Sequence, residues 1–302
     1  IDADVGNYND DYAGCDVSRG LGYMFNGDNF DEDDGGRLGY HENPPAIGCD
    51  FFEGRYHDAD GRDNVGPYID SNVVLITPTV IEAMADTGIV YSGIGVGYSD
   101  GLVDNERFGM RRFTYYTNAA AYPYSDPGAA AEFYNFMSGS WANGSEMFYG
   151  GAGYVGSTGA TTIPSDYMFP GDSDPLDWAT NGTAVPFTNW SEAETDGSGG
   201  SNPPGDRRFV QSAGPFTLKP GAINNITVGI VYGRSQEGDL FASVEALRRA
   251  DTKAQALFDA CFKILDPPAA PKLTIQELEN ELILMLENPV TSNNYNESYE
   301  EE

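Results

Sequence analysis

The sequence predicts a mainly-β fold: a β-sandwich-like domain with loop-rich insertions and one or two packed helices, followed by the start of a second β-domain. Two observations lead to this prediction. Short segments rich in β-branched and aromatic residues alternate with turn residues, and the 37 glycines follow no collagen-like period. The 302 residues are 40% hydrophobic and 13% aromatic, which is enough to form the core of one large or two ordinary domains.

Strands are expected first in the N-terminal part of the chain, at 15–25, 46–52, 73–81, 88–97 and 107–116. Apolar residues alternate along the first segment, and Gly20 or Gly22 is expected to mark a bulge in it. Pro78 limits the third segment to a sheet edge or a break, because proline cannot donate to a β-ladder.

The middle of the chain is expected to contain a helix, a strand and a long loop. Asp126-Pro127 precedes a helix over 128–141, in which Phe133, Phe136, Met137 and Trp141 recur at helical spacing and are expected to be core. Residues 147–153 are expected to form a strand that ends in glycines. Residues 156–208 are rich in loop-forming residues, and a long ordered loop is usually functional.

The C-terminal third carries the clearest periodicity. Residues 209–218 and 226–232 are expected to pair as a hairpin, because Pro and Gly lie between them. A helix capped by Asp239 and running to about Leu265 has one apolar face, on which Cys261 is expected to be buried. After the proline-rich stretch 266–271, the strands expected at 272–275 and 281–286 resemble the opening of an Ig/fibronectin type III-like domain. The expected domains are therefore 1–266 and 267–302.

The charge balance limits the classes of partner. With 47 acidic and 16 basic residues the net charge is −31, so the positive surface that nucleic acids and anionic membranes require is missing. No run of about 18 apolar residues exists, which argues against membrane insertion. The self-repulsion calls for bound cations or high external salt. The alternative is that the acid excess only keeps a marine or halophilic protein soluble.

Two acidic loops have the composition of calcium sites. In the first, Asp58, Asp60 and Asp63 surround Gly61. In the second, Asp100, Asp104 and Glu106 likewise accompany a glycine, Gly101. Calcium takes six to eight oxygens at about 2.3–2.6 Å, and a glycine allows the backbone to turn so that they converge. Ordinary turns, in which Asp and Asn bond their own backbone, are the alternative, and neither loop fits the EF-hand pattern. A third loop, 28–36, is either solvated or an additional cation site.

The cysteines and histidines offer little for catalysis or for zinc. Cys15, Cys49 and Cys261 lack zinc-site spacing, although Cys15 and Cys49 could form one disulfide in an oxidising compartment. His41 and His57 are the only histidines, and no HExxH, GxSxG or Cys/His pattern accompanies them. Carboxylate pairs for glycoside hydrolysis occur by chance among 47 acids, so no catalytic residue is assigned.

Aromatic residues of the long loop leave two alternatives open. Trp178, Trp190 and Phe187 could form a stacking platform for carbohydrate, or they could pin the loop to the core. The second alternative is favoured.

Four blocks of sequence follow one another along the chain in a specific order: 43–54, 103–113, 168–172 and 203–218. Together they resemble a poorly characterised module of large proteins that Bacteroidetes-type bacteria export through the type IX secretion system. The resemblance covers most of 1–266 and implies an extracellular or cell-surface location, with no catalytic residues to carry over. The start at Ile1 suggests a piece of a longer exported polypeptide.

These observations favour a non-catalytic extracellular or cell-surface module, structural or adhesive, stabilised by Ca²⁺ in its acidic loops. Its expected partners are other surface proteins, copies of itself or extracellular polysaccharide. The alternatives are a polysaccharide- or protein-degrading enzyme domain and a carbohydrate-binding module of a larger secreted enzyme.

Overall fold

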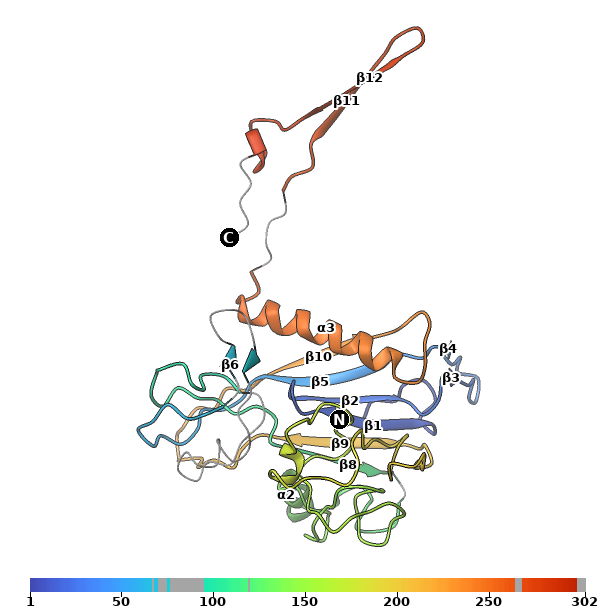
Figure 1. Cartoon of the computed structure of the whole chain (residues 1–302), viewed down its shortest axis with the longest axis vertical. Helices are drawn as coiled ribbons and strands as arrows, with labels where there is room; N and C mark the ends of the chain where they lie inside the picture. The colour runs from blue at the N-terminus through green and yellow to red at the C-terminus, as the bar shows by residue number, and fades with distance from the viewer. Residues whose placement is uncertain (67, 70–74, 77–94, 119, 264–267, 298–302) are drawn as a thin grey trace. The chain divides into compact units, whose positions relative to one another are not determined.

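A computed structural model describes residues 1–66, 68–69, 75–76, 95–118, 120–263 and 268–297 (Figure 1). By their internal contacts the residues separate into two units, 1–255 and 256–302. The described elements are mainly strands in several antiparallel sheets, as the sequence predicts, with two α-helices among them. Neither described helix is long and apolar enough to cross a membrane.

A four-stranded antiparallel sheet forms the centre of the first unit, in the order β1-β2-β5-β10. Its strands are β1 (Asp11–Asp16), β2 (Leu21–Asn26), β5 (Ala46–Glu53) and β10 (Thr227–Gly233). The strand expected at 46–52 is therefore confirmed. The single strand expected at 15–25 is wrong, because the chain reverses at 17–20 and β1 pairs with β2. Gly20 has φ +77° and serves this turn rather than a bulge.

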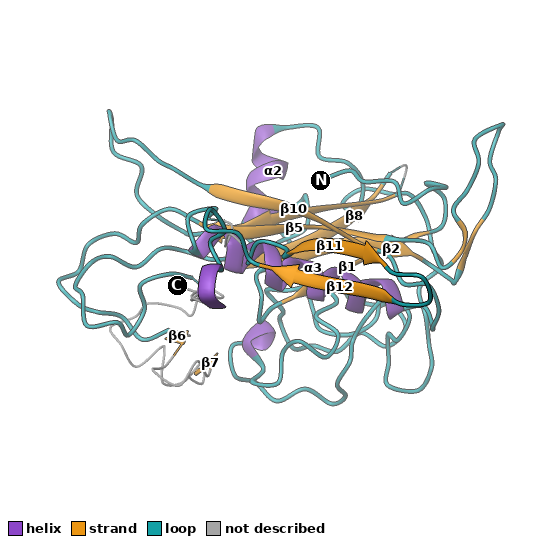
Figure 2. Cartoon of the chain, turned by 90° about the horizontal axis from the view of Figure 1, so that it is seen from above, coloured by secondary structure: helices purple, strands orange, loops and turns teal. Residues whose placement is uncertain are grey.

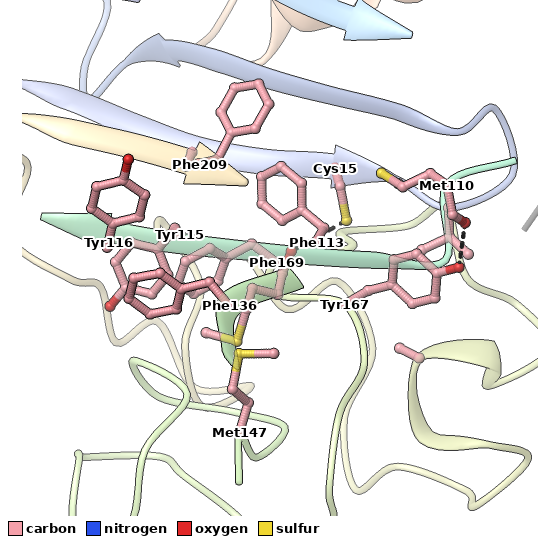
Figure 3. Close-up of a cluster of buried hydrophobic side chains, with 14 of the residues drawn as sticks. Cys15, Met110, Phe113, Tyr115, Tyr116, Phe136, Met147, Tyr167, Phe169 and Phe209 are labelled. Carbon is pink, nitrogen blue, oxygen red and sulfur yellow. Dashed lines mark hydrogen bonds between the residues drawn. The ribbon is translucent and has the colours of Figure 1, made fainter. Parts of the chain in front are cut away.

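One face of this sheet packs against a second, two-stranded sheet of β8 (Arg112–Thr117) and β9 (Arg207–Ser212). Gly22 of β2 makes the approach possible, since a Cβ there would lie 2.8 Å from the Phe113 ring and 2.9 Å from the Phe209 ring. Figure 3 shows these rings with Cys15 in the resulting core, where the Tyr167 hydroxyl donates to the Met110 carbonyl oxygen at 2.7 Å.

The opposite face packs against helix α3 (Ala242–Asp259), which runs along the sheet (Figures 1 and 2). Tyr23 and Phe25 of β2 and Val231 of β10 lie in one cluster with Val244 and Leu247 of the helix. The helix ends six residues before the expected Leu265, because Cys261 and Phe262 take left-handed conformations. Cys261 is consequently exposed, and its expected burial is wrong.

The expected hairpin of 209–218 with 226–232 is wrong. β9 pairs with β8, and β10 pairs with β5, so the two segments belong to different sheets. Their proximity in sequence suggested a hairpin, but Phe209 is fully buried between the sheets while β10 extends the edge of the larger one. Strand β8 also begins later than expected, at Arg112.

The middle of the chain has less regular structure than expected. Helix α2 spans only Ala130–Met137, and the Glu132 carboxylate accepts hydrogen bonds from the backbone N–H groups of Gly128 and Ala129 ahead of it. Phe136 is fully buried as expected, whereas Phe133 and Met137 are each 46% exposed. The strand expected at 147–153 does not form. An isolated bridge between Phe148 and Pro164 stands in its place.

Tryptophans hold the long loop in place. From within the loop, the Trp190 indole donates to the Gly151 carbonyl oxygen at 3.0 Å, and the Trp141 indole fastens the same glycine-rich stretch ahead of the loop by donating to the Gly153 carbonyl oxygen at 3.2 Å. Trp178 and Trp190 are 4% and 0% exposed, so they pin the loop and offer no stacking platform.

The disulfide that Cys15 and Cys49 could have formed is absent, and both thiols are free and buried. Both residues lie opposite Gly22, Cys15 on one side of β2 and Cys49 on the other. Two strand spacings of about 4.8 Å separate them, whereas bridged cysteines need Cα atoms within about 7 Å. The Cys15 thiol instead donates to the Met168 carbonyl oxygen at 3.2 Å.

The second unit contains a hairpin of β11 (Lys272–Glu277) and β12 (Leu282–Glu287), which matches the two strands expected there. Every residue of the hairpin strands is exposed. The remaining short elements are β3 (Phe30–Asp31), β4 (His41–Glu42), β6 (Tyr68–Ile69), β7 (Leu75–Ile76) and the 3₁₀ turns η1 (Trp178–Thr180) and η2 (Tyr295–Glu297). Apart from β7 and residues 95–97, the strands expected at 73–81 and 88–97 lie outside the described residues.

Candidate metal site

The two acidic loops that the sequence singles out separately lie against each other in the structure. The Asp104 Oδ1 atom, from the second loop, accepts hydrogen bonds from the backbone N–H groups of Asp60 (2.7 Å) and Gly61 (2.9 Å) in the first. In return, the Asp63 Oδ2 atom accepts from the Gly101 N–H at 2.7 Å. Each loop therefore caps the other, and we refer to residues 58–64 and 99–106 as the interlocked loops.

Two glycines make this interlocking possible. Gly61 has φ +80° and Gly101 has φ +86°, and each presents its N–H group to a carboxylate of the opposite loop. A Cβ added at either glycine would meet no atom of the described residues within 4 Å. Backbone conformation rather than space therefore requires glycine at both positions.

Three buried oxygen atoms in the interlocked loops have no hydrogen-bond partner among the described residues. Glu106 is 0% exposed; its Oε1 atom accepts from the Asn64 N–H, but its Oε2 atom is unpaired. The Oδ1 atoms of Asp63 and Asn105 are buried and unpaired as well. A buried acceptor without a partner costs about 1–3 kcal/mol, and more when it is charged. Three such oxygens are available as ligands, and a hard cation prefers oxygen ligands.

The pKa of Glu106 also indicates that positive charge is missing from the interlocked loops. Burial raises the pKa of this carboxyl above its ordinary value, the Asn64 N–H lowers it, and the nearby Asp63 and Asp60 carboxylates raise it further. Arg107, the next residue, makes its ion pair elsewhere, with Glu53 at 2.5 Å. A divalent cation would stabilise the ionised form of Glu106.

The remaining predicted ligands behave in two ways. Asp60 and Asp100 accept from their own loops, Asp60 from the Arg62 N–H at 3.0 Å and Asp100 from the Leu102 N–H at 2.8 Å, as ordinary turns do. Asp58 stands apart from the interlocking contacts: its carboxylate accepts from the Thr217 N–H at 3.0 Å and pairs with Arg55 at 3.3 Å. Hydrogen bonds from Thr217 and the Arg55 charge lower its pKa.

Asparagine is the part of this arrangement that the sequence reasoning missed. Asn105 supplies one of the unpaired oxygens, and Asn64 is 2% exposed and holds both Glu106 and Asp60. The available signal was the Asp-Asn pair present in both loops, at 63–64 and 104–105.

A different group of carboxylates comes closest to a compact triad. Among the described residues, Asp2, Asp4 and Asp206 form the group whose oxygen atoms all lie within 4.8 Å of one another. Arg208 already compensates it, because its guanidinium pairs with Asp2 at 3.0 Å and with Asp206 at 3.6 Å. The interlocked loops instead offer a mixed set of two carboxylates and an amide.

The third acidic loop supports a small hairpin of β3 and β4. Asp31 is fully buried and accepts from the backbone N–H groups of Asn7 (2.8 Å) and Tyr40 (2.5 Å). Asp33 pairs with His41 at 2.9 Å. These contacts give two of its acids structural partners.

His57 packs beside the first interlocked loop. Its ring stacks on Phe108 with centroids 3.8 Å apart and bonds to the Tyr98 hydroxyl. Burial lowers its pKa to about 4, so the imidazole is neutral at pH 7 and adds no positive charge to the loops.

Comparisons with protein-family models, with curated proteins and with solved structures found no match.

Proposed function

We propose that the chain is a non-catalytic structural or adhesive module of an extracellular or cell-surface protein, and that its interlocked loops bind Ca²⁺. The observation that carries this proposal is the Glu106 Oε2 atom: a buried carboxylate oxygen without a hydrogen-bond partner among the described residues, between loops that supply two more unpaired oxygens. The ion would tie two segments that lie some forty residues apart in sequence, as the Asp104 contact to Gly61 indicates.

The mixed donor set favours calcium over magnesium. Ca²⁺ accepts six to eight oxygens in a flexible geometry, including amide and backbone carbonyl oxygens, whereas Mg²⁺ demands near-ideal octahedral geometry and keeps its waters. Asp63, Asn105 and Glu106 supply oxygens of both chemical kinds. Water and backbone oxygens would complete the shell.

The charge of the chain and its surface support the rest of the proposal. A net charge of −31 destabilises the compact state through self-repulsion, and bound Ca²⁺ reduces it. Extracellular modules bind Ca²⁺ with dissociation constants of about 10⁻⁴–10⁻³ M, which suits an exported protein. For adhesion, β10 exposes Val228, Ile230 and Tyr232 toward other surface proteins, copies of itself or extracellular polysaccharide.

Isothermal titration of the chain with CaCl₂ tests the proposal. We expect saturable binding in the wild type and at least tenfold weaker binding in Glu106→Gln and Asp63→Asn, because each variant removes a charged ligand from the interlocked loops. Asp58→Asn is the matched control: it removes the same charge from the same loop but lies outside the interlocking contacts, so binding should persist. Equal affinities in all four proteins would contradict the proposal.

A further inference from the structure

Two buried aspartates face each other between the four-stranded sheet and α3. Asp50 lies on β5 and is 1% exposed, and Asp251 lies on α3 and is 2% exposed. The register of β5 places Asp50 opposite Leu21 and Gly229, on the face that α3 covers. The Asp251 carboxylate lies close enough to Asp50 to raise the pKa of Asp50, and the buried Oδ1 atom of each residue has no hydrogen-bond partner among the described residues.

Neighbouring cations are engaged elsewhere. Asp16, at the end of β1, is fully buried and pairs with Arg248 of α3 and with Arg19, both at 2.9 Å. Arg248 also pairs with Asp172 at 2.9 Å and with Glu245 at 2.7 Å. No ion pair among the described residues reaches Asp50 or Asp251. The other titratable groups close to this place are Tyr23 on β2 and Cys49 on β5.

Two neighbouring carboxylates in a buried site cannot both ionise at low cost. Burial and the neighbouring Asp251 raise the pKa of Asp50 to about 8, and burial raises that of Asp251 to about 6. Protons bound by two such interacting carboxyl groups belong to the pair as a unit rather than to either residue.

We propose that Asp50 and Asp251 share one proton and that this proton holds α3 against the sheet, so that raising the pH through neutrality loosens the helix. The sign follows from linkage: the docked state holds a proton that the undocked, solvated carboxyls release near their ordinary value of about 4, so docking weakens as pH rises. This device is separate from the Ca²⁺ site, since the pair lies between β5 and α3 and the proposed ligands lie in the interlocked loops.

Hydrogen exchange of the α3 amides, corrected for intrinsic exchange rates, tests the proposal. In the wild type the opening equilibrium of α3 should rise with pH, by up to about tenfold per pH unit between pH 5 and pH 8, and then level off. In Asp251→Asn the amide can donate to an ionised Asp50, so this rise should disappear. Asp50→Asn is the second variant, should the first fail to fold. Asp172→Asn, which removes an exposed partner of Arg248, should keep the wild-type slope.

An infrared titration provides the second readout. The wild type should show protonated carboxylic-acid absorption at pH 7 that Asp50→Asn or Asp251→Asn reduces and Asp172→Asn leaves unchanged; burial also raises the pKa of Asp11, to about 9, so a band from Asp11 remains in every variant. A pH slope of α3 exchange that is unchanged in both pair variants would overturn the proposal, and so would a band that both variants retain at the full wild-type intensity.

Discussion

Two irregular regions of this molecule are held in place by opposite means. The long loop around Trp190 is fixed by large buried side chains, and the Trp190 indole donates to the Gly151 carbonyl oxygen. The interlocked loops are fixed by carboxylates that cap backbone N–H groups across a pair of left-handed glycines, and they leave three acceptor oxygens unpaired among the described residues. Regions fastened by apolar burial should therefore be indifferent to cations, and regions fastened by carboxylates should depend on them.

The largest effect is expected in the aromatic region. Trp190→Ala removes a fully buried ring and the hydrogen bond to Gly151, and should lower the free energy of unfolding by about 3–5 kcal/mol. Chemical denaturation measures this loss, which should be the same in CaCl₂ and in EDTA. A loss that CaCl₂ restores would break the distinction between the two regions.

The next effect is expected at Glu192, which joins the loop to the sheet. Its carboxylate is 0% exposed, forms a two-pronged ion pair with Arg207 at 2.9–3.1 Å and accepts from the Ala13 N–H. Glu192→Gln leaves the Arg207 charge buried without its counter-ion and should destabilise by about 3 kcal/mol or slightly less, because the amide keeps part of the hydrogen bonding. Denaturation at two salt concentrations checks this, since a buried pair is screened little. A loss below about 0.5 kcal/mol would mean that the pair behaves as a surface bridge.

A smaller effect is expected from pH at the interlocked loops. The pKa of Glu106 is raised by its burial, so protons compete with Ca²⁺ for this carboxylate, and affinity should fall as the pH is lowered through that pKa. Titrations with CaCl₂ between pH 4.5 and pH 7.5 measure the trend. Affinity that stays constant, or that rises toward acid pH, would remove Glu106 from the ligand set.

The smallest effect is expected from Phe133 of α2. Phe133→Ala should change the free energy of unfolding by no more than about 0.5–1 kcal/mol, because the ring is 46% exposed, whereas Phe136→Ala removes a fully buried ring and should cost about 3–5 kcal/mol. Thermal unfolding of the two variants compares them directly. Equal losses would show that both rings are core.

Local pattern predicted the elements whose signal lies within one segment. The mainly-β class, β5, the β11–β12 hairpin and most of α3 follow from alternation and from helical spacing. Pairing between distant segments did not follow: β10 joins β5 and β9 joins β8 because of long-range burial, and proximity in sequence suggested a hairpin instead. The 15–25 segment alternates straight through its turn, so only Gly20's left-handed conformation reveals the reversal.

The candidate site shows the same limit. Composition singled out both acidic loops, but spacing within a loop cannot tell which loop lies opposite which. Asp58 has the same local pattern as Asp63. Its carboxylate nevertheless accepts a hydrogen bond from the N–H group of Thr217, which is distant in sequence. Asn105 was overlooked because an amide oxygen becomes a candidate ligand only when its surroundings leave it unpaired.

Calorimetry of the wild type in CaCl₂ and in EDTA tests the central claim most directly. With Ca²⁺ at about one hundred times the dissociation constant, binding should add about 2.7 kcal/mol and raise the melting temperature by about 5–10 °C, and Glu106→Gln should lose this increase. A melting temperature that is the same in CaCl₂ and EDTA would contradict the claim that the interlocked loops bind Ca²⁺.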